Sequence, residues 1–325
     1  VQYWWARQET GETLKMFARL LRGSILVLMA IMLSGCDLVL LNPAGDVARQ
    51  QSNLLIASVY IMLLIVIPVI LMTLVFAWWY RESNEEATYK PDWDHSTQIE
   101  LYVWAAPLLI IIALGAMTWI STHVLDPFEP LSRISEEQPI AEDYEPMHIQ
   151  AIALEWKWLF IYPEQGIATV NEVAAPVDQP IRFQITSPRL MNSLFIPSLA
   201  GMVYAMPGME TQIQAVINEP GDYYGVSGNY SGEGYSDMRF RFHGLSEEDF
   251  AQWVSKAKAS GAALSTGRYN ELVEPSKKHP VQRFARVEDG LYHRILNLCV
   301  DPDKICKDVL MAMDAKRDAH AAGDH

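Results

Sequence analysis

Two long apolar stretches dominate the first half of the chain. No residue from Gln50 to Tyr80 is charged, and the stretch from Leu101 to Leu125 carries only His123 as an ionisable residue other than tyrosine. Each stretch exceeds the ~20 residues that an α-helix needs to cross the hydrocarbon layer of a membrane. We therefore expect a hairpin of two transmembrane helices, at about residues 50–80 and 100–123.

The second half has a different pattern, in which short apolar runs alternate with proline and glycine. A linker containing Pro127, Pro130 and Pro139 separates it from the apolar stretches. The clearest runs are Met147 to Tyr162, Ile181 to Thr186, Thr211 to Asn218 and Asp237 to Phe242. Short strands at this spacing favour an antiparallel sandwich or barrel over alternating strands and helices. We expect an all-β domain over residues 127–245.

A helix is expected directly after this domain. Ser246 can cap its start, and an apolar face is formed by Phe250, Trp253, Val254 and Ala257. The helical pattern weakens beyond Ala259. Residues 246–325 are therefore interpreted as a C-terminal helical extension that ends, from Met311, in a polar and mobile tail.

The charge balance excludes one class of partner. The chain has 25 Lys and Arg residues against 39 Asp and Glu residues, a formal net charge of −14. Nucleic-acid binding draws most of its affinity from clustered Lys and Arg, so we expect no nucleic-acid partner. The mean hydropathy of +0.04 averages the two apolar stretches with an acidic remainder.

The N-terminal region has the pattern of a secretory signal. Lys15, Arg19 and Arg22 precede an apolar run over residues 25–33, which is too short to span a membrane. We expect residues 1–35 to be a signal sequence that is removed. Because Met16 stands just before the basic residues, 1–15 are interpreted as a candidate over-extended start.

The signal ends in a short motif around a cysteine. Leu33-Ser34-Gly35-Cys36 resembles the bacterial lipobox, in which the cysteine thiol receives diacylglycerol and the peptide bond before it is cut. We expect lipid on Cys36, and an ordinary buried cysteine is the alternative. Residues 36–126 are then the lipid anchor and the transmembrane hairpin.

Lipid on Cys36 also sets the expected topology. The modified cysteine lies outside the cytoplasm, so the hairpin places residues 81–99 inside and returns the chain outside near His123. Cys299 and Cys306 would then lie in an oxidizing compartment, which favours a disulfide over free thiols. Pro302 between them supplies the turn that a bridge between cysteines seven residues apart requires.

The lipobox, the hairpin and an external β domain containing Glu155-Trp156-Lys157-Trp158 together resemble subunit II of the haem-copper respiratory oxidases. This resemblance implies a cupredoxin-like fold for residues 127–245. In the cytochrome c oxidase branch the domain holds a two-copper centre, with an early histidine followed by C-x-E-x-C-x-x-x-H-x-x-M. Laid onto this sequence, the ligand positions fall on Asn192, Ser227, Asn229, Ser231, Tyr235 and Met238. Only the methionine remains.

These substitutions remove the chemistry that a two-copper centre needs. Copper at such a site requires imidazole and bridging thiolates, and serine hydroxyls do not replace thiolates at neutral pH. His148 and His243 leave at most a site with one histidine and Met238. We therefore expect no metal and no cofactor in this chain.

An oxidase subunit without this two-copper centre resembles the quinol-oxidizing branch, and most closely the cytochrome bo-type ubiquinol oxidases. The segments 161–171 and 229–231 resemble family signatures, and the resemblance extends from the lipobox to about Val254, so that the C-terminal seventy residues add little. It implies a bacterial inner-membrane complex that oxidizes ubiquinol, reduces oxygen to water and pumps protons. Haems, a copper ion and ubiquinol are expected in subunit I.

Within that complex the chain is expected to be a non-redox structural and assembly subunit, with its main domain in the periplasm. Its expected partners are subunit I, the smaller subunits III and IV, and membrane lipid, but not cytochrome c. Two alternatives remain open. The chain could be a copper-carrying cytochrome c oxidase subunit II, or a lipid-anchored cupredoxin-like binding module.

Three further residues receive roles from the resemblance. The sequence His95-Ser96-Thr97-Gln98-Ile99-Glu100 fits a pattern whose glutamate stands at the mouth of a proton-uptake channel, so Glu100 is a candidate channel entrance. The alternative is a solvated acid at a helix end. Trp156 and Trp158 alternate with Lys157 in a predicted strand, so both should point to one face, and we interpret them as candidates for the interface with subunit I.

Overall fold

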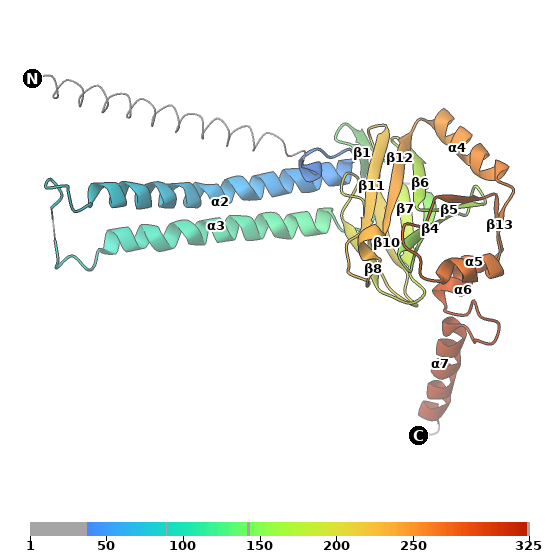
Figure 1. Cartoon of the computed structure of the whole chain (residues 1–325). Coiled ribbons are helices and arrows are strands. Elements are labelled where there is room, and N and C mark those ends of the chain that lie inside the picture. Colours follow the sequence, from blue (N-terminus) through green and yellow to red (C-terminus); the bar gives the residue numbers. More distant parts are fainter. Residues whose placement is uncertain (1–37, 89, 142–143, 324–325) are drawn as a thin grey trace, which may run out of the picture. The chain divides into compact units, whose positions relative to one another are not determined.

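The structure, a computed structural model, describes residues 38–88, 90–141 and 144–323 (Figure 1). The predicted signal sequence and Cys36 lie outside the described residues. The chain divides into two units, 1–42 and 43–325. In the first unit the described element is the short 3-10 helix η1 (Val39–Leu41), and all the elements below belong to the second.

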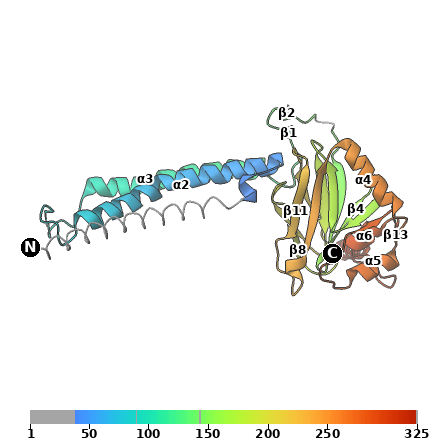
Figure 2. The same cartoon turned by 45° about the horizontal axis from the view of Figure 1, so that its top comes forward.

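The two apolar stretches form helices α2 (Asp46–Trp79) and α3 (Thr97–Val124), which lie side by side (Figures 1 and 2). Each helix begins a few residues earlier than the sequence predicts. Both are long and apolar enough to cross a membrane, with mean hydropathies of 3.0 and 2.1. Pro68 lies inside α2 and Pro107 inside α3 without ending either helix. The predicted helical hairpin is therefore confirmed.

The β domain consists of two main sheets. One has six strands in the order β10-β7-β3-β4-β5-β14, and the other has five in the order β6-β12-β11-β8-β9. The strands of the first are β3 (Met147–Leu154), β4 (Lys157–Tyr162), β5 (Ile167–Val170), β7 (Ile181–Thr186), β10 (Thr211–Ala215) and β14 (Gln282–Phe284). Those of the second are β6 (Glu172–Pro176), β8 (Asn192–Phe195), β9 (Met202–Ala205), β11 (Gly221–Ser227) and β12 (Arg239–Leu245).

Two small pairs complete the strands: β1 (Arg133–Ser135) with β2 (Gln138–Pro139), and β13 (Ala263–Leu264) with β15 (Arg286–Val287). Most pairings are antiparallel, as predicted, but β3 with β7, β12 with β6, and β13 with β15 are parallel. The predicted run from Met147 to Tyr162 is two strands, because the chain turns at Trp156, whose φ is 65°. The left-handed conformation at this residue reverses the chain.

Both faces of the six-stranded sheet are buried along β4 and β5. On β4, Trp158 and Phe160 point into the space between the two sheets and contact Phe240 of β12. The intervening Leu159 and Ile161 belong to a second apolar cluster on the opposite face. Successive side chains of a strand point to opposite faces of its sheet, and in β4 the side chains on both faces are apolar.

The second cluster is covered by the C-terminal extension. This extension contains α4 (Glu247–Ala259), α5 (Thr266–Val273), α6 (Leu291–Leu296) and α7 (Lys307–Gly323). Ser246 caps α4 as predicted, accepting a hydrogen bond of 3.1 Å from the backbone N–H of Asp249. The extension is not only helical, because β14 pairs with β5 at the edge of the six-stranded sheet. The segment from Met311 forms the greater part of helix α7, and its mobility stays a prediction.

Lys157 joins this extension to the sheet. Its side chain has no exposed surface, and its ammonium donates to the carbonyls of Leu272 and Glu274, both at 2.8 Å, and of Glu155 at 3.2 Å. Burial lowers the pKa of Lys157 to about 8, against the opposing effect of the Glu155 and Glu274 carboxylates. The ammonium therefore satisfies carbonyls at the C-terminal end of α5, which helix geometry leaves without partners.

Candidate functional site

The predicted copper-ligand positions gather at one end of the five-stranded sheet. Asn192 begins β8 and Ser227 ends β11, and these strands pair so that Ser227 stands opposite Leu194. The other positions follow on the connection from β11 to β12, which contains the 3-10 helix η2 (Tyr235–Asp237): they are Asn229, Ser231, Tyr235 and Met238. The fold thus brings together positions that are far apart in sequence, as the resemblance implies.

Hydrogen bonds between neutral groups fill the centre of this cluster. The Ser227 hydroxyl is 3.3 Å from Oδ1 of Asn192 and 3.4 Å from the carbonyl of Asn229, and its single proton serves one of them at a time. Its oxygen also accepts from the backbone N–H of Ser193 at 3.4 Å. Asn192, Ser193 and Ser227 are all buried. A buried polar cluster is stable only when its groups form hydrogen bonds, and the groups named here do so.

The loop from β11 to β12 closes over Trp156. The indole N–H of Trp156 donates to the carbonyl of Ser231 at 3.0 Å. A Cβ at Gly234 would lie 2.2 Å from the indole ring, so only glycine permits this close approach. The Ser231 hydroxyl is buried and has no hydrogen-bond partner within the described part of the chain.

The structure places the two tryptophans in different surroundings. Trp158 has no exposed surface and packs against Phe160 and Phe240. A side chain enclosed in this way cannot contact another subunit, so the interface role predicted for Trp158 is wrong. Trp156 is partly buried and packs against the same core, with its polar edge engaged by Ser231. A role of Trp156 at an interface stays a prediction.

The remaining positions do not add a metal ligand set. Met238 is 1% exposed, and its thioether is enclosed in the core. Tyr235 packs edge-on against the exposed ring of Tyr230, with the ring centroids 5.7 Å apart. Hydroxyl and amide groups bind copper poorly without thiolate or imidazole, so these residues do not fit a two-copper centre.

The alternative of a one-histidine site fails on geometry. His243 stands opposite Asp222 in the pairing of β11 with β12, whereas Ser227 lies at the other end of β11. Five residues of extended strand separate the positions 222 and 227 by about 17 Å. His243 therefore cannot join Met238 as a ligand at the cluster, and His148 lies on β3 in the other sheet.

His243 instead belongs to a charged cluster that the sequence analysis missed. Glu172 on β6 accepts two hydrogen bonds from Arg283 on β14, at 2.8 and 2.7 Å, and lies 3.3 Å from Nε2 of His243. Nδ1 of His243 contacts Asp222 on β11. The four residues come from four strands, so no local sequence pattern could have revealed them.

The cluster shifts the pKa of its members. Burial alone would raise the pKa of Glu172, but hydrogen bonds from His243 and Arg283 and the guanidinium charge outweigh it and lower that pKa to about 2. The hydrogen bond to Glu172 raises the pKa of His243, although burial opposes the change. A shared network of this kind ties β6 and β12 of one sheet to β14 of the other.

Glu100 lies in the first turn of α3. Its backbone N–H donates to the carbonyl of Ser96 at 3.0 Å, and its carboxylate is 2.6 Å from Nδ1 of His95. The side chains of Glu100 and His95 are 51% and 63% exposed, so the carboxylate reaches water in this chain. A carboxylate also stabilises the positive end of the helix dipole.

Cys299 and Cys306 are joined by a disulfide, with their Cα atoms 4.8 Å apart. The bridge closes the connection between α6 and α7, where Cys299 is buried. Pro302 lies inside this connection, outside both helices. The chain therefore turns back between the two cysteines, which one straight helix would hold about 10 Å apart.

Comparisons with known proteins agree with this architecture. Residues 143–243 match the family model "Cytochrome C oxidase subunit II, periplasmic domain", and residues 258–303 match "COX Aromatic Rich Motif". Cytochrome bo(3) ubiquinol oxidase subunit 2 of Pseudomonas aeruginosa is 52% identical over 267 residues, covering 82% of this chain and 78% of that protein. Ubiquinol oxidase subunit 2 of Acetobacter aceti is 48% identical, covering 82% and 84%. The chain belongs to the ubiquinol oxidase subunit 2 family.

As a member of the ubiquinol oxidase subunit 2 family, the chain is a membrane-anchored protein with a periplasmic β domain. A cytochrome bo(3) ubiquinol oxidase subunit 2 of Buchnera aphidicola is 42% identical over 285 residues, covering 87% of this chain and 95% of that protein. These relatives are quinol oxidase subunits, so the alternative of a copper-carrying cytochrome c oxidase subunit is the less supported one.

The family match corrects one prediction about the C-terminal region. We expected the last seventy residues to add little, but 258–303 match the aromatic-rich motif. This segment contains α5, β14 and α6, whose apolar side chains cover the six-stranded sheet. The aromatic residues Tyr269 and Phe284, which the structure buries, are the sequence signal that could have indicated this motif.

Proposed function

We propose that this chain is a non-redox structural and assembly subunit of a complex that oxidizes ubiquinol, reduces oxygen to water and translocates protons. The observation that carries the proposal is the cluster of Asn192, Ser227 and Asn229, in which neutral hydrogen bonds occupy the centre that a metal would need. A chain without a redox group passes no electrons. The donor must then reach another subunit directly, as a quinol dissolved in the membrane can.

The proposal assigns the redox groups to subunit I, which would hold the haems, a copper ion and the ubiquinol. This chain would bind subunit I and the smaller subunits III and IV, together with membrane lipid. The exposed apolar surfaces of α2 and α3 support a role inside such an assembly, since helices of this kind pack against other helices or lipid.

Copurification tests the assignment. The full chain, tagged after α7 and extracted in mild detergent, should carry with it a large haem-containing membrane subunit in equal amount. The haem spectrum and quinol-dependent oxygen consumption of the eluate measure this directly. Elution of the chain alone would contradict the proposal and favour the alternative of a lipid-anchored binding module.

We further propose that Glu100 stands at the entrance of a proton-uptake channel in subunit I. Its carboxylate is half exposed at the start of α3 and lies beside the titratable ring of His95. A carboxylate there raises the local proton concentration, and it can release a proton to a neighbouring group. Its contribution would be kinetic, because its side chain is half exposed and its contact among the described residues is with the exposed His95.

The Glu100→Gln variant should reduce oxygen several-fold more slowly with quinol as donor, since it lacks the negative charge that concentrates protons at the channel entrance. Assembly and haem content should not change, because Gln keeps the size of the side chain. Turnover and haem are measured on one preparation. Glu100→Asp should retain more activity, since the acid survives.

Glu85→Gln is the matched control, because Glu85 is another exposed acid in the connection between α2 and α3. This variant should turn over at the wild-type rate. A wild-type rate for Glu100→Gln from about pH 6 to about 9 would assign Glu100 to a solvated helix end, because removing a group that delivers protons to the reaction lowers the rate.

We also propose that residues 1–35 are removed and that Cys36 carries lipid. The motif Leu33-Ser34-Gly35-Cys36 supports this. Intact-mass measurement should show a chain that starts at Cys36 with added acyl mass. Cys36→Ala should block the cleavage, yet the protein should remain in the membrane, because two apolar helices hold a protein far more strongly than an acyl chain. Release of this variant into the soluble fraction would contradict the helix assignment.

A further inference from the structure

The outer face of the five-stranded sheet carries one row of side chains across four strands. The members of the row stand directly opposite one another in the strand pairing, and they are Arg239 of β12, Val226 of β11, Phe195 of β8 and Met202 of β9. Residues opposite each other in this way point to the same face of a sheet. The neighbouring residues Phe240, Leu194 and Val203 belong to the core between the two sheets, so the row itself points outward.

Large side chains of this outer face reach solvent. Tyr204, Tyr224 and Arg241 lie two residues along their strands from members of the row and share its face. Met202 and Tyr204 are 46% and 44% exposed, and Tyr224 is 57% exposed. Contiguous exposed patches with apolar and aromatic side chains mark contacts with other molecules.

The two arginines of this face have no carboxylate partner among the described residues. The side chain of Arg239 donates to the carbonyl of Ser236 at 3.2 Å, and that of Arg241 donates to the Tyr224 hydroxyl at 2.7 Å. The guanidinium of Arg241 also lies over the ring of Tyr224, 3.6 Å from its centroid. A partner that presents carboxylates is therefore complementary to this face, although the chain as a whole has a net charge of −14.

The composition of the face is that of a protein interface. Tyr, Phe, Met and Arg are enriched at the centre of protein interfaces, whereas Lys and Glu are depleted. The outward residues named above include neither lysine nor glutamate. Segments that bind lipid head groups are rich in lysine as well as arginine, so the composition favours a protein over lipid.

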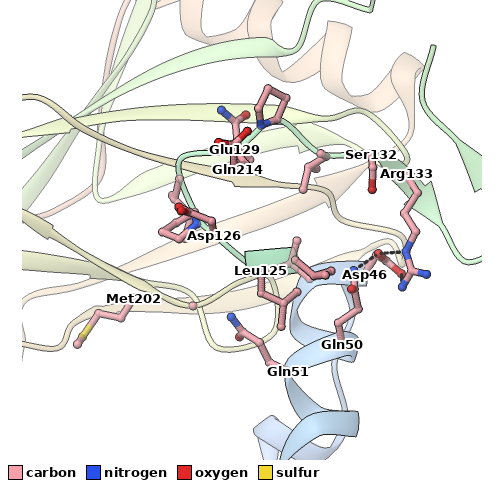
Figure 3. Close-up of a pocket in the computed structure, with 17 residues that line it drawn as sticks. Asp46, Gln50, Gln51, Leu125, Asp126, Glu129, Ser132, Arg133, Met202 and Gln214 are labelled. Carbon is pink, nitrogen blue, oxygen red and sulfur yellow. Dashed lines mark hydrogen bonds and ion pairs between the residues drawn. The ribbon is translucent and has the colours of Figure 1, made fainter. Parts of the chain in front are cut away.

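The face is turned toward the membrane. Figures 1 and 2 show β11 and β8 on the side of the domain from which α2 and α3 extend, with β4 behind them. Met202 lines a cavity together with Gln51 of α2 and Leu125 after α3 (Figure 3). The backbone N–H of Ala48 in α2 donates to the carbonyl of Leu199, just before β9, at 3.3 Å. The row therefore begins beside the hairpin, and a protein that meets it is one embedded in the membrane next to the hairpin.

We propose that the outer face of the five-stranded sheet docks on the periplasmic surface of the large membrane subunit of the complex, at a patch whose carboxylates face Arg239 and Arg241. The proposal rests on the proposed function, because it takes subunit I as the partner. The row from Arg239 to Met202 lies at the centre of this contact. The β domain, and not only the hairpin, then forms part of the assembly interface.

Hydroxyl-radical footprinting tests this docking. The intact complex and the full chain alone are placed in nanodiscs of the same lipid and oxidised in parallel. Met202 and Tyr224 should be oxidised several-fold more slowly in the complex, because the partner excludes water from the face. Met313 of α7 is 56% exposed and serves as the internal standard, so its oxidation rate should be equal in both samples.

A charge reversal tests the part of the arginines. Arg239→Glu should make Met202 and Tyr224 in the complex react as fast as in the chain alone, or should lower the haem content, since like charges then meet across the interface. Arg286→Glu is the matched control, because Arg286 is an exposed arginine of β15 in the C-terminal extension that forms no ion pair within the described part of the chain. This control should keep both the protection and the haem.

The outcomes separate this docking from the proposed function. If the complex contains haem but Met202 and Tyr224 react as fast as in the chain alone, the docking is overturned and the proposed function stands. Slow oxidation in the chain alone would show that lipid covers the face, and wild-type protection in Arg239→Glu would remove the arginines from the contact; either result also overturns the docking. A chain that carries no haem-containing subunit contradicts the proposed function, and the docking with it.

Discussion

The full chain carrying Asn192→His, Ser227→Cys, Asn229→Glu, Ser231→Cys and Tyr235→His should bind two copper ions and become coloured. The backbone already brings the first three of these positions together, since the Ser227 hydroxyl lies within 3.4 Å of both Asn192 and Asn229. Met238 is the one ligand position of the family motif that is unchanged in this sequence. Two cysteines add the bridging thiolates that copper pairs require.

Copper content of the full chain after metal loading, together with the visible spectrum, measures this result. The matched control carries only Asn192→His, Asn229→Glu and Tyr235→His, and it should stay colourless because it lacks thiolates. The unchanged chain should also bind no copper. A five-substitution variant that folds but remains colourless would show that the alignment of the ligand positions onto this loop is wrong.

The second large effect is on stability, through the cluster around Glu172. Glu172→Gln keeps the size of the side chain but removes the charge that Arg283 and His243 contact. Removing one partner of a buried ion pair costs about 3–5 kcal/mol. Arg283 is about one third exposed, so we expect a smaller loss in the free energy of unfolding, about 2 kcal/mol.

Urea unfolding of the full chain in detergent measures this difference. Glu271→Gln is the control, because its partner Arg268 lies three residues away on α5 and both side chains are exposed. Such a surface pair contributes about 0–1 kcal/mol. A loss for Glu172→Gln no larger than that of the control would show that the cluster does not hold β6, β12 and β14 together.

The effect of Glu172→Gln should depend on pH in a defined window. Glu172 has a pKa lowered from 4.5 to about 2, so its contribution is complete above pH 4.5 and is lost as the pH falls through 2. His243 has a pKa raised above 6.5, so its contribution is complete below pH 6.5 and is lost as the pH rises through the raised value. The difference between wild type and variant should be largest between these two values, 4.5 and 6.5.

Several features could be read from the sequence because each depends on neighbours along the chain. The absence of charge from Gln50 to Tyr80 predicts a membrane helix without any tertiary information, because length and polarity alone decide it. The same holds for α4, whose cap at Ser246 and apolar face lie within one segment. The cluster at Asn192 and Ser227 was located by the resemblance to a known family, whose ligand motif can be laid onto this sequence.

The sequence did not predict features that depend on contacts between distant segments. The sequence of β4 suggests a strand with one exposed face. In the structure Trp158 faces the second sheet, and the C-terminal extension covers the opposite face, so β4 is buried on both sides. The strand β14 is three residues long, too short for its own pattern, and exists because it pairs with β5.

The sequence by itself therefore determined the membrane hairpin and the β domain, since composition and spacing carry that information, and its resemblance to a known family implied the loss of the copper ligands. Only the tertiary structure decided the ion cluster around Glu172 and the partners of Lys157. The hydrogen bonds from Arg283 to Glu172 and from Lys157 to Leu272 join residues more than a hundred positions apart. Their energy comes from burial and proximity, which exist only once the sheets have packed.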